Sequence, residues 1–406
     1  MITGASDDDP SGIGTYSQVG AQFGFGMLWT MLFSFPLMVC TQVICARIGR
    51  VTGHGIAANV RRHYSARVLF PIVTLLLIAN TINIGADLGA MGAALQLLIG
   101  GPTLAYTVCF AVLSLLLQIY VPYSRYVRIL KWLTLALFAY VAAVFSLHIP
   151  WRQVAVSTLM PKLSFESGYV TAVVAIFGTT ISPYLFFWQA SEEVEDLQAA
   201  AGEEPLLAVP AQAPGQFSRM NSDTYFGMGI SNIVAFSIIL TTAVTLHAHG
   251  MTHIGTAAQA ATALRPIAGD FAFGLFSLGI IGTGLLAVPV LAGSAAYGAA
   301  EALGWKFGME RRAAEARRFY AVIAAAVLIG LALNFIGVDP IKALFWTAVI
   351  NGVVAVPLLV VIMLMASQRR VMRQFTIPRY LKWGGWTTAA FMTASAIAMF
   401  VLWPHD

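Results

Sequence analysis

Two short polar stretches interrupt an otherwise apolar chain: DDDPSG at residues 7–12 and GTTISPY at residues 178–184. Proline removes an amide donor from a helix and clashes with the preceding turn, so each stretch should be unwound and leave main-chain carbonyls without helical partners. Carbonyl oxygens at membrane depth are ligands for cations, and a carboxylate beside one break favours cations over anions. The two stretches therefore predict a cation site between two broken helices.

A structural interpretation of the same prolines is a kink that neighbouring helices accommodate. Either break alone is as consistent with a kink as with a site. The two breaks, however, occupy equivalent places in the two halves of the chain, and one of them is acidic. This pairing is typical of a transporter built from inverted repeats, whose substrate lies between the broken helices, and it favours the functional interpretation.

The composition is that of a polytopic α-helical membrane protein. Of the 406 residues, 58% are hydrophobic and 10% are charged, which is too little polar surface for a soluble domain. The broken segment from Met1 to about Gly20 is taken as helix 1. Cys40, Cys45 and Cys109 lie inside apolar runs and predict neither a disulfide framework nor a metal site. Apolar runs predict ten further helices, at roughly 27–46, 68–98, 103–121, 128–149, 168–190, 224–248, 269–300, 318–336, 341–366 and 383–403.

Lys and Arg are distributed unevenly between the connections of this eleven-helix arrangement. Only four of the 23 fall on one side, namely Arg152, Lys162, Arg265 and Lys342. The side with the excess is predicted to be cytoplasmic, with the N-terminus inside and the C-terminus outside, in a bacterial inner membrane. Because the basic residues lie in short loops, no nucleic-acid partner is expected. The other nineteen are Arg47, Arg50, Arg61, Arg62, Arg67, Arg125, Arg128, Lys131, Arg219, Lys306, Arg311, Arg312, Arg317, Arg318, Arg369, Arg370, Arg373, Arg379 and Lys382.

One long polar stretch, residues 191–221, predicts a mobile cytoplasmic linker. It separates residues 1–190, with the first six helices and both breaks, from residues 222–406, with helices 7 to 11, within a single transport domain. There is no Walker motif, no Gly-x-Ser-x-Gly elbow and no His-Glu-x-x-His. We therefore expect neither an enzyme nor an ATP-driven pump.

The residues at the two breaks resemble a known family. Asp9-Pro10-Ser11-Gly12 resembles the Asp-Pro-Gly-Asn motif of the Nramp divalent-metal transporters, and Ile181-Ser182-Pro183-Tyr184 is similar to their helix-6 motif, which usually reads Met-Pro-His. Residues 45–53 and 94–98 resemble the ends of helices 2 and 3 in that family. The resemblance covers helices 1 to 6 well and the rest mainly by hydropathy. It implies a LeuT-type fold, in which helices 1 to 5 and 6 to 10 are inverted repeats, and transport of a divalent metal.

The resemblance also implies a metal site, carried over position by position. Asp9 matches the metal-binding Asp, while Ser6 and Thr179 match positions that offer main-chain carbonyls. Ser182 stands where the family has a metal-binding Met, and Gly12 replaces the Asn. Without the soft thioether, a harder and partly hydrated ion is expected, with Mg²⁺ or Mn²⁺ ahead of Fe²⁺. This is similar to the Nramp-related branch proposed to carry magnesium; the cation is the substrate, and no cofactor is expected.

Coupling to protons is expected to be weak or absent. Tyr184 stands in the place of the family's helix-6 His, and a phenol does not titrate near neutral pH. Asp87 matches an acidic position on helix 3, but its partner one turn earlier is Ile84. As a carboxylate inside the membrane, Asp87 is expected on an ion path or a residual proton path. The alternative is a carboxylate capped by Asn80 or Asn83.

Three further polar residues have two interpretations each. Asp7 and Asp8 either attract cations into the vestibule, which we favour slightly, or bond to free helix amides. Asn351 either lends an amide oxygen to the metal site or makes a hydrogen bond between helices. The group His247, His249 and His253 favours a solvated loop over a metal site.

The start of the chain is unusual for this fold. Only eight residues precede Asp9, and as a helix they would span about 12 Å, against a hydrocarbon core of about 30 Å. We therefore expect either that Met1 is a misassigned start or that helix 1 is truncated.

Two rival functions remain open. A transporter of the same fold for an organic substrate, such as an amino acid, is disfavoured because three carboxylates at the first break would repel the substrate's own carboxylate. A non-transporting membrane scaffold or receptor, with polar breaks that serve only packing, should tolerate Asp9→Ala. The sequence does not determine the oligomeric state.

Overall fold

The long apolar runs of the sequence form long helices. The computed structural model describes residues 9–403 apart from 123, 124, 126, 127, 129, 131 and 201, and the regular structure within these residues is helical throughout. Nine of the described helices are long and apolar enough to cross a membrane. The prediction of an all-α protein of the membrane is confirmed. The spans are α3 (Trp29–Thr52), α5 (Ala66–Ile99), α6 (Thr103–Tyr120), α10 (Ser167–Thr180) joined to α11 (Pro183–Ala199), α12 (Ala213–Thr245), α15 (Ala272–Leu303), α16 (Arg317–Leu333), α17 (Pro340–Ser367) and α19 (Arg379–Val401).

Two other predicted spans correspond to shorter helices. The predicted fifth helix is represented by η2 (Leu133–Leu137) with α8 (Phe138–Ser146), and the chain then bends by 117° into α9 (Trp151–Leu159). The described part of helix 1 is α2 (Pro10–Phe23). With these two, each of the eleven predicted helices has a counterpart. Residues 1–8, which include Ser6, Asp7 and Asp8, lie outside the described residues.

Both polar breaks coincide with the start of a helix. Asp9 is the N-cap of α2, and Ser182 is the N-cap of α11. In each case proline follows at the first helical position, where its missing N–H costs nothing because that group has no helical partner. Only Ile181 and Ser182 separate α10 from α11. Helix 6 is therefore discontinuous, as predicted.

Helix α10 packs very closely against α17. A β-carbon added at Gly178 would clash with the main chain at Ala348 and Gly352, and one added at Gly352 would lie 2.5 Å from the carbonyl oxygen of Val174. Small residues allow helix backbones to approach in this way. The contact brings the helix-6 break close to Asn351, the residue before Gly352.

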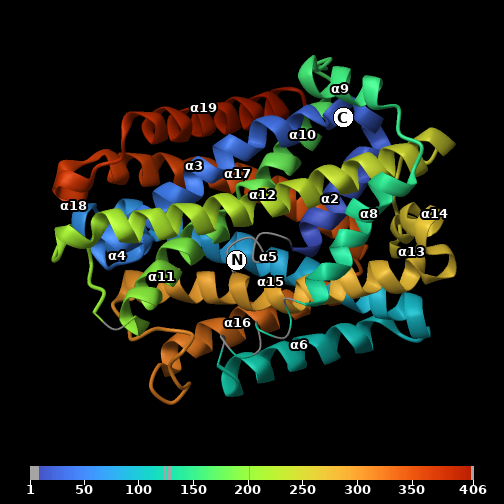
Figure 1. The fold of residues 1–406 in the computed structure, drawn as a ribbon. Helices are drawn as coiled ribbons and strands as arrows, with labels where there is room; N and C mark the ends of the chain where they lie inside the picture. The colour runs from blue at the N-terminus through green and yellow to red at the C-terminus, as the bar shows by residue number, and fades with distance from the viewer. Residues whose placement is uncertain are drawn as a thin grey trace.

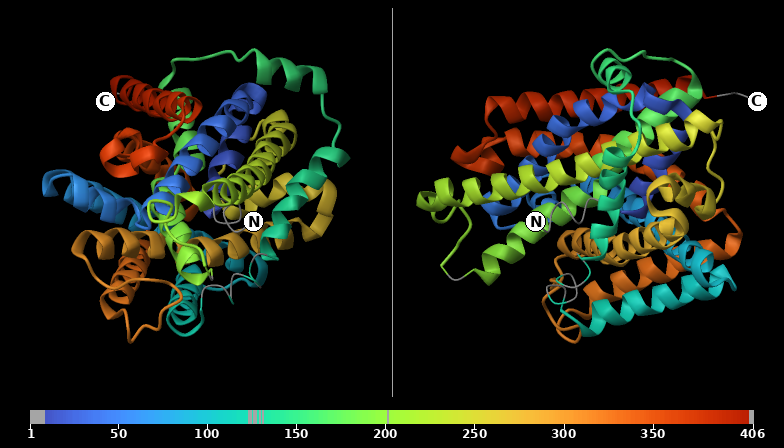
Figure 2. Two further views of the ribbon diagram at one scale, coloured as in Figure 1. Left: turned by 60° about the vertical axis from the view of Figure 1, so that its left-hand side comes forward. Right: turned by 45° about the vertical axis from the view of Figure 1, so that its right-hand side comes forward.

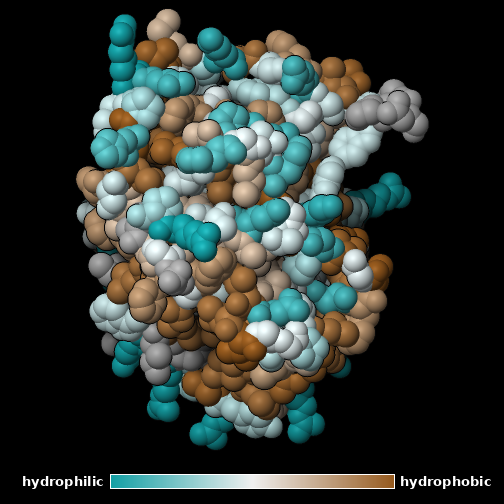
Figure 3. Space-filling view, turned by 90° about the vertical axis from the view of Figure 1, so that its right-hand side faces the viewer, coloured by the Kyte–Doolittle hydropathy of each residue, from teal (hydrophilic) through white to brown (hydrophobic). Residues whose placement is uncertain are grey.

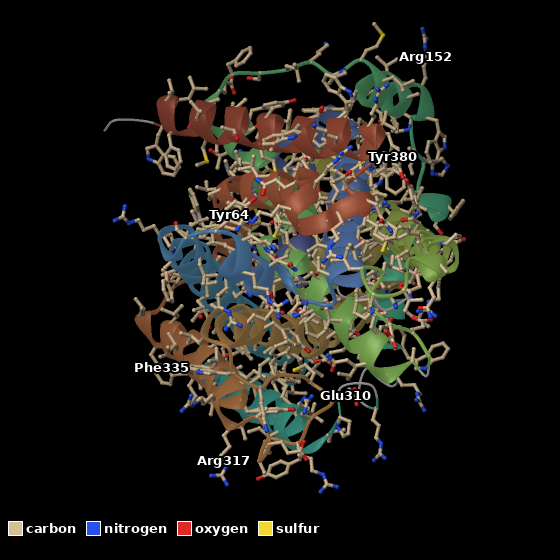
Figure 4. The ribbon with its side chains drawn as sticks, turned by 90° about the vertical axis from the view of Figure 1, so that its left-hand side faces the viewer. Tyr64, Arg152, Glu310, Arg317, Phe335 and Tyr380 are labelled. Carbon is tan, nitrogen blue, oxygen red and sulfur yellow. The ribbon has the colours of Figure 1, made fainter. Side chains whose placement is uncertain are left out.

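The bundle has two chemically different ends. One end, called the basic end here, carries α4 (Ile56–His63), the connection after α15, and α18 (Arg369–Met372); the opposite end carries α9, α13 (Ala257–Ala261) and α14 (Arg265–Ala268) (Figure 1). Figure 2 shows α6 and α19 at opposite outer sides of the bundle, where lipid would surround them. Figure 3 looks onto the opposite end and Figure 4 onto the basic end.

The connection between the two halves is shorter than the stretch that we expected to be a linker. Helix α11 continues to Ala199 and α12 begins at Ala213, so helix extends into both sides of residues 191–221. The segment between these helices is 200–212. The proposed division of the chain at this stretch stays a prediction.

Candidate metal-binding site

Asp9 is a buried carboxylate held only by neutral donors. Its side chain is almost fully buried, and it accepts hydrogen bonds from the main-chain N–H of Gly12 at 2.8 Å and from the Ser11 hydroxyl at 2.7 and 2.8 Å, one to each oxygen. Asn83 donates a further bond at 2.9 Å. Within the described residues no basic side chain forms a salt bridge with Asp9. A buried carboxylate is costly without a positive partner, so the site is suited to a cation.

Asn83 links two carboxylates and two other helices. Its amide N–H₂ donates to Asp9 and, at 3.3 Å, to Asp87. Its oxygen accepts from the amide of Asn351 at 3.3 Å. These bonds join α2, α5 and α17 in one buried polar chain of Asp9, Asn83, Asp87 and Asn351.

Asp87 joins this buried polar chain through one of its two carboxylate oxygens. The residue is fully buried in α5, and its second carboxylate oxygen has no hydrogen-bond partner among the described residues. Asn80 does not cap it, because the Asn80 amide donates to the carbonyl of Leu291 in α15 at 2.9 Å. The capping alternative therefore applies to Asn83, which contacts Asp9 as well.

The break in helix 6 supplies oxygen atoms opposite the break that holds Asp9. The Ser182 hydroxyl donates to the carbonyls of Gly178 at 2.7 Å and Thr179 at 2.9 Å, both at the end of α10. A β-carbon added at Gly12 would lie 3.3 Å from the Thr179 hydroxyl oxygen. The two breaks therefore meet at Gly12 and Thr179, with Asp9 in the first break and Ser182 in the second.

Three other predicted residues, Tyr184, His247 and His249, have hydrogen-bonding contacts in the structure. The main-chain carbonyl of Tyr184 accepts from Ser294 of α15 at 2.8 Å. A ring nitrogen of His247 lies 2.8 Å from the carbonyl of Ala21, and one of His249 lies 2.8 Å from the carbonyl of Thr245. In the part of the chain that the structure describes, no group of three or more His, Cys, Asp or Glu side chains could hold a metal.

Asn83 is the site residue that sequence reasoning missed as a direct partner of Asp9. The available signal was its position on α5, four residues before Asp87, which places both side chains on the same helical face. From that spacing, Asp87 is the only partner of Asn83 that could be predicted. The contact with Asp9, 74 positions away in sequence, depends on how α2 packs against α5.

At the basic end, one buried arginine gathers three carboxylates. Arg50, the last basic residue of α3, forms salt bridges with Glu193 and with Asp196 at 3.0 Å, both in α11, and with Glu203 at 2.8 Å. Glu203 also pairs with Arg219 of α12 at 2.8 Å. Its hydrogen bond to Arg219, together with the charges of Arg219 and Arg50, lowers the pKa of Glu203. This group, called the Arg50 cluster, ties α3, α11 and α12 together.

At the opposite end, a cavity of about 530 Å³ lies beside α2. Gln18 and Gln22 of α2 line it, nine and thirteen residues after Asp9, or about 14 and 20 Å along the helix. Lys342 and Trp346 of α17 also line it. The cavity thus lies at the end of the bundle toward which α2 runs from Asp9.

Comparisons with known proteins show which proteins this chain is similar to. Two similar proteins are named divalent metal cation transporter MntH. The one from Klebsiella pneumoniae subsp. pneumoniae is 24% identical over 397 residues, which cover 95% of this chain and 89% of that protein. The one from Acidiphilium cryptum is 26% identical over 373 residues, which cover 90% and 80%. These relatives are transporters, which confirms the prediction that the chain is not an enzyme.

Solved structures share the fold. The Eremococcus coleocola manganese transporter, in complex with an aromatic bis-isothiourea substituted compound, matches with a TM-score of 0.76 at 17% identity, covering 99% of this chain and 85% of that chain. MhsT in complex with L-phenylalanine matches with a TM-score of 0.67 at 12% identity, covering 99% and 97%. The predicted LeuT-type architecture is confirmed at the level of the fold.

The same comparisons test the resemblance seen at the two breaks. The family model described as "Natural resistance-associated macrophage protein-like" matches residues 1–402, which is nearly the whole chain. The chain belongs to the Nramp family.

Proposed function

We propose that this protein is a secondary transporter that moves divalent metal cations across the membrane. The observation that carries the proposal is Asp9, a buried carboxylate without a basic partner among the described residues, at the point where two helix breaks meet. The names of the similar proteins, a divalent metal cation transporter and a manganese transporter, support it. The metal is the transported substrate, and no cofactor is proposed.

The proposed ligands are oxygen atoms. Asp9 supplies the charge, and the other donors are the oxygens at Ser6, Gly12, Thr179, Ser182 and Asn351. Carboxylate, hydroxyl, carbonyl and water oxygens suit Mg²⁺ and Mn²⁺ better than ions that prefer sulfur. For a metal to bind, the Ser11 hydroxyl must turn away from the Asp9 carboxylate. The Ser182 oxygen can offer a lone pair while its hydrogen still donates to the carbonyl of Gly178. We therefore propose a preference for Mg²⁺ or Mn²⁺ over Fe²⁺.

We further propose that coupling to protons is weak or absent. A phenol at Tyr184 does not exchange protons near neutral pH. Asp87, and with it Asp7 and Asp8, would then form the path of the ion into and out of the site. Asp87 supports this role because one of its oxygens is not used by any described hydrogen-bond donor.

Transport requires access to Asp9 from each side in turn. The cavity beside Gln18 is proposed as the outer entrance, and the Arg50 cluster as a closure of the inner end. The count of Lys and Arg supports a cytoplasmic basic end in a bacterial inner membrane. The N-terminus is then inside and the C-terminus outside.

Metal uptake into proteoliposomes tests the proposal. Vesicles should take up Mg²⁺ and Mn²⁺ without acidification of an internal pH dye. Asp9→Asn should reduce uptake by at least about a hundredfold, because it removes the only charge proposed to bind the metal. Glu204→Gln is the matched control, since it also removes one carboxylate but at an exposed residue of the 200–212 connection. Equal uptake by Asp9→Asn and Glu204→Gln would contradict the proposal, as would uptake of an amino acid in place of metal.

A further inference from the structure

A basic pocket lies where α15 ends and α16 begins, at the basic end of the bundle. The cavity has about 380 Å³. Figure 4 shows Arg317, one of its residues, at the outer edge of this end, away from the centre of the bundle. The pocket therefore lies where the protein meets the surrounding lipid. Its lining residues are Gly304, Trp305, Lys306, Ala314, Glu315, Ala316, Arg317 and Arg318.

The positive charges of this pocket are not neutralised by the protein. Lys306, Arg317 and Arg318 are exposed, and none of them forms a salt bridge with another described residue. Glu315 is the one acidic residue of the lining. The guanidinium of Arg318 lies 5.4 Å from the ring centroid of Trp305, which orients it by a cation–π contact. The net charge of the lining favours an anion.

A fourth cation, from a different part of the chain, lies next to one of the lining residues. Gly304 ends α15 in a left-handed conformation, at φ 71°. A β-carbon at this position would collide with the guanidinium of Arg61 in α4. Arg61 therefore lies directly against the glycine that lines the pocket, and α4, the connection after α15 and α16 all contribute positive charge.

An exposed apolar stripe continues from the pocket along α16. The exposed residues of α16 after Arg317 and Arg318 are Ala321, Ala325, Ala332, and the pair Leu328 and Ile329, which are 53% and 55% exposed. Spacings of three and four residues place them on one face of the helix. Leu303, the last residue of α15, is also exposed. A cationic pocket above an apolar helix face matches a headgroup above an acyl chain.

We propose that this pocket binds an anionic phospholipid, with its phosphate between Lys306, Arg317 and Arg318 and an acyl chain along the exposed face of α16. Arginine and lysine hold phosphate through charge-assisted hydrogen bonds, and a tryptophan beside them is typical of the membrane interface. A soluble phosphate would use the same cations but would have no use for the apolar stripe. The proposal does not depend on which ion the protein carries.

Native mass spectrometry of the delipidated protein tests the proposal with three probes: phosphatidylglycerol, phosphatidylethanolamine with the same acyl chains, and inorganic phosphate. Phosphatidylglycerol should bind more tightly than the other two. The variant K306Q/R317Q/R318Q should lose at least about tenfold in affinity for phosphatidylglycerol, because each basic residue near an anionic lipid surface contributes roughly fivefold. The variant R369Q/R370Q/K382Q is the matched control, since it removes the same charges from exposed positions of the same end, and it should change little.

A measurement on the otherwise unchanged protein covers the case in which the triple variant does not fold. Phosphatidylglycerol brominated on its acyl chains should quench tryptophan fluorescence, and Trp305→Phe should remove part of that quenching. Equal binding of phosphatidylethanolamine, equal loss in the control variant, or quenching unchanged by Trp305→Phe would overturn the proposal. Binding of inorganic phosphate as tight as that of phosphatidylglycerol would also overturn the proposal. The pocket would then be a site for a soluble anion.

Discussion

At the scale of single residues, the buried polar chain explains how a carboxylate can remain in the bundle before a metal arrives. Asn83 donates to both Asp9 and Asp87 and is itself fixed by Asn351. Hydrogen bonds from neutral donors stabilise a carboxylate without cancelling its charge. Asp9 therefore keeps its attraction for a cation, and its orientation is fixed by helices α5 and α17.

Replacing Asn83 tests this positioning role. Asn83→Ala should lower the free energy of unfolding by about 1–3 kcal/mol, since it leaves buried partners without a donor. It should also weaken Mn²⁺ binding at least tenfold, because Asp9 and Asn351 are no longer held in place. Asn80→Ala is the control: it removes a similar buried bond, to Leu291, outside the polar chain. Calorimetric titration should show weaker metal binding in the first variant only; equal affinities would contradict the role of Asn83.

Ser182 tests the expected preference for hard cations. Ser182→Met would introduce a thioether at the helix-6 break, where soft sulfur favours soft ions. The ratio of Cd²⁺ to Mg²⁺ uptake should rise by tenfold or more. Ser182→Leu introduces a side chain similar in size to Met but without sulfur, and it should leave the ratio unchanged. Competition uptake assays on the two variants therefore distinguish the effect of the sulfur from the effect of side-chain size. A rise in both variants would mean that Ser182 acts by size.

At the scale of elements, the Arg50 cluster explains why helix extends into a stretch that reads as a linker. The carboxylates of residues 191–204 look solvated in sequence, yet Glu193 is buried and paired with Arg50. The partner lies 143 positions earlier, at the end of α3. No local pattern contains that information, whereas the spans and the two breaks follow from local hydropathy and proline. For the same reason the contact between Asn83 and Asn351, 268 positions apart, was not visible.

Breaking the Arg50 cluster should be costly. Arg50→Gln leaves Glu193 buried without its cation, which typically costs about 3–5 kcal/mol of folding free energy. Arg219→Gln removes an exposed partner of Glu203 and should cost about 1 kcal/mol or less. Chemical unfolding in detergent measures both variants. A loss for Arg50→Gln no larger than that for Arg219→Gln would mean that the cluster does not stabilise the basic end.

Acid should weaken the same cluster through Glu203. Arg219 and Arg50 lower the pKa of Glu203 below its ordinary value of 4.5. The folded state therefore binds this proton less readily than the unfolded state. The stabilisation is present above about pH 4.5 and is lost as the pH falls through the lower pKa of the folded state. Thermal unfolding between pH 5 and pH 3 should show a smaller decline for Glu203→Gln than for the unchanged protein; identical profiles would contradict this assignment.

At the scale of the whole molecule, the structure has a cavity at the opposite end and a cluster of salt bridges at the basic end. The cavity beside Gln18 lies at the end where α2 finishes, and the Arg50 cluster lies at the other end, with Asp9 between them. The sequence was sufficient to predict the family, the positions of the nine long spans among the described residues and the break in helix 6. It could not predict the cavity or the cluster, because both are formed by side chains from distant helices.

The location of the bound ion tests the central claim most directly. Crystals grown with Mn²⁺ and measured at a wavelength where manganese scatters anomalously would reveal the ion without assumptions about its ligands. We predict one strong peak between Asp9 and the helix-6 break at Thr179 and Ser182, absent from Asp9→Asn crystals. A peak at another place in a protein that transports Mn²⁺, or a peak that persists in Asp9→Asn, would contradict the account.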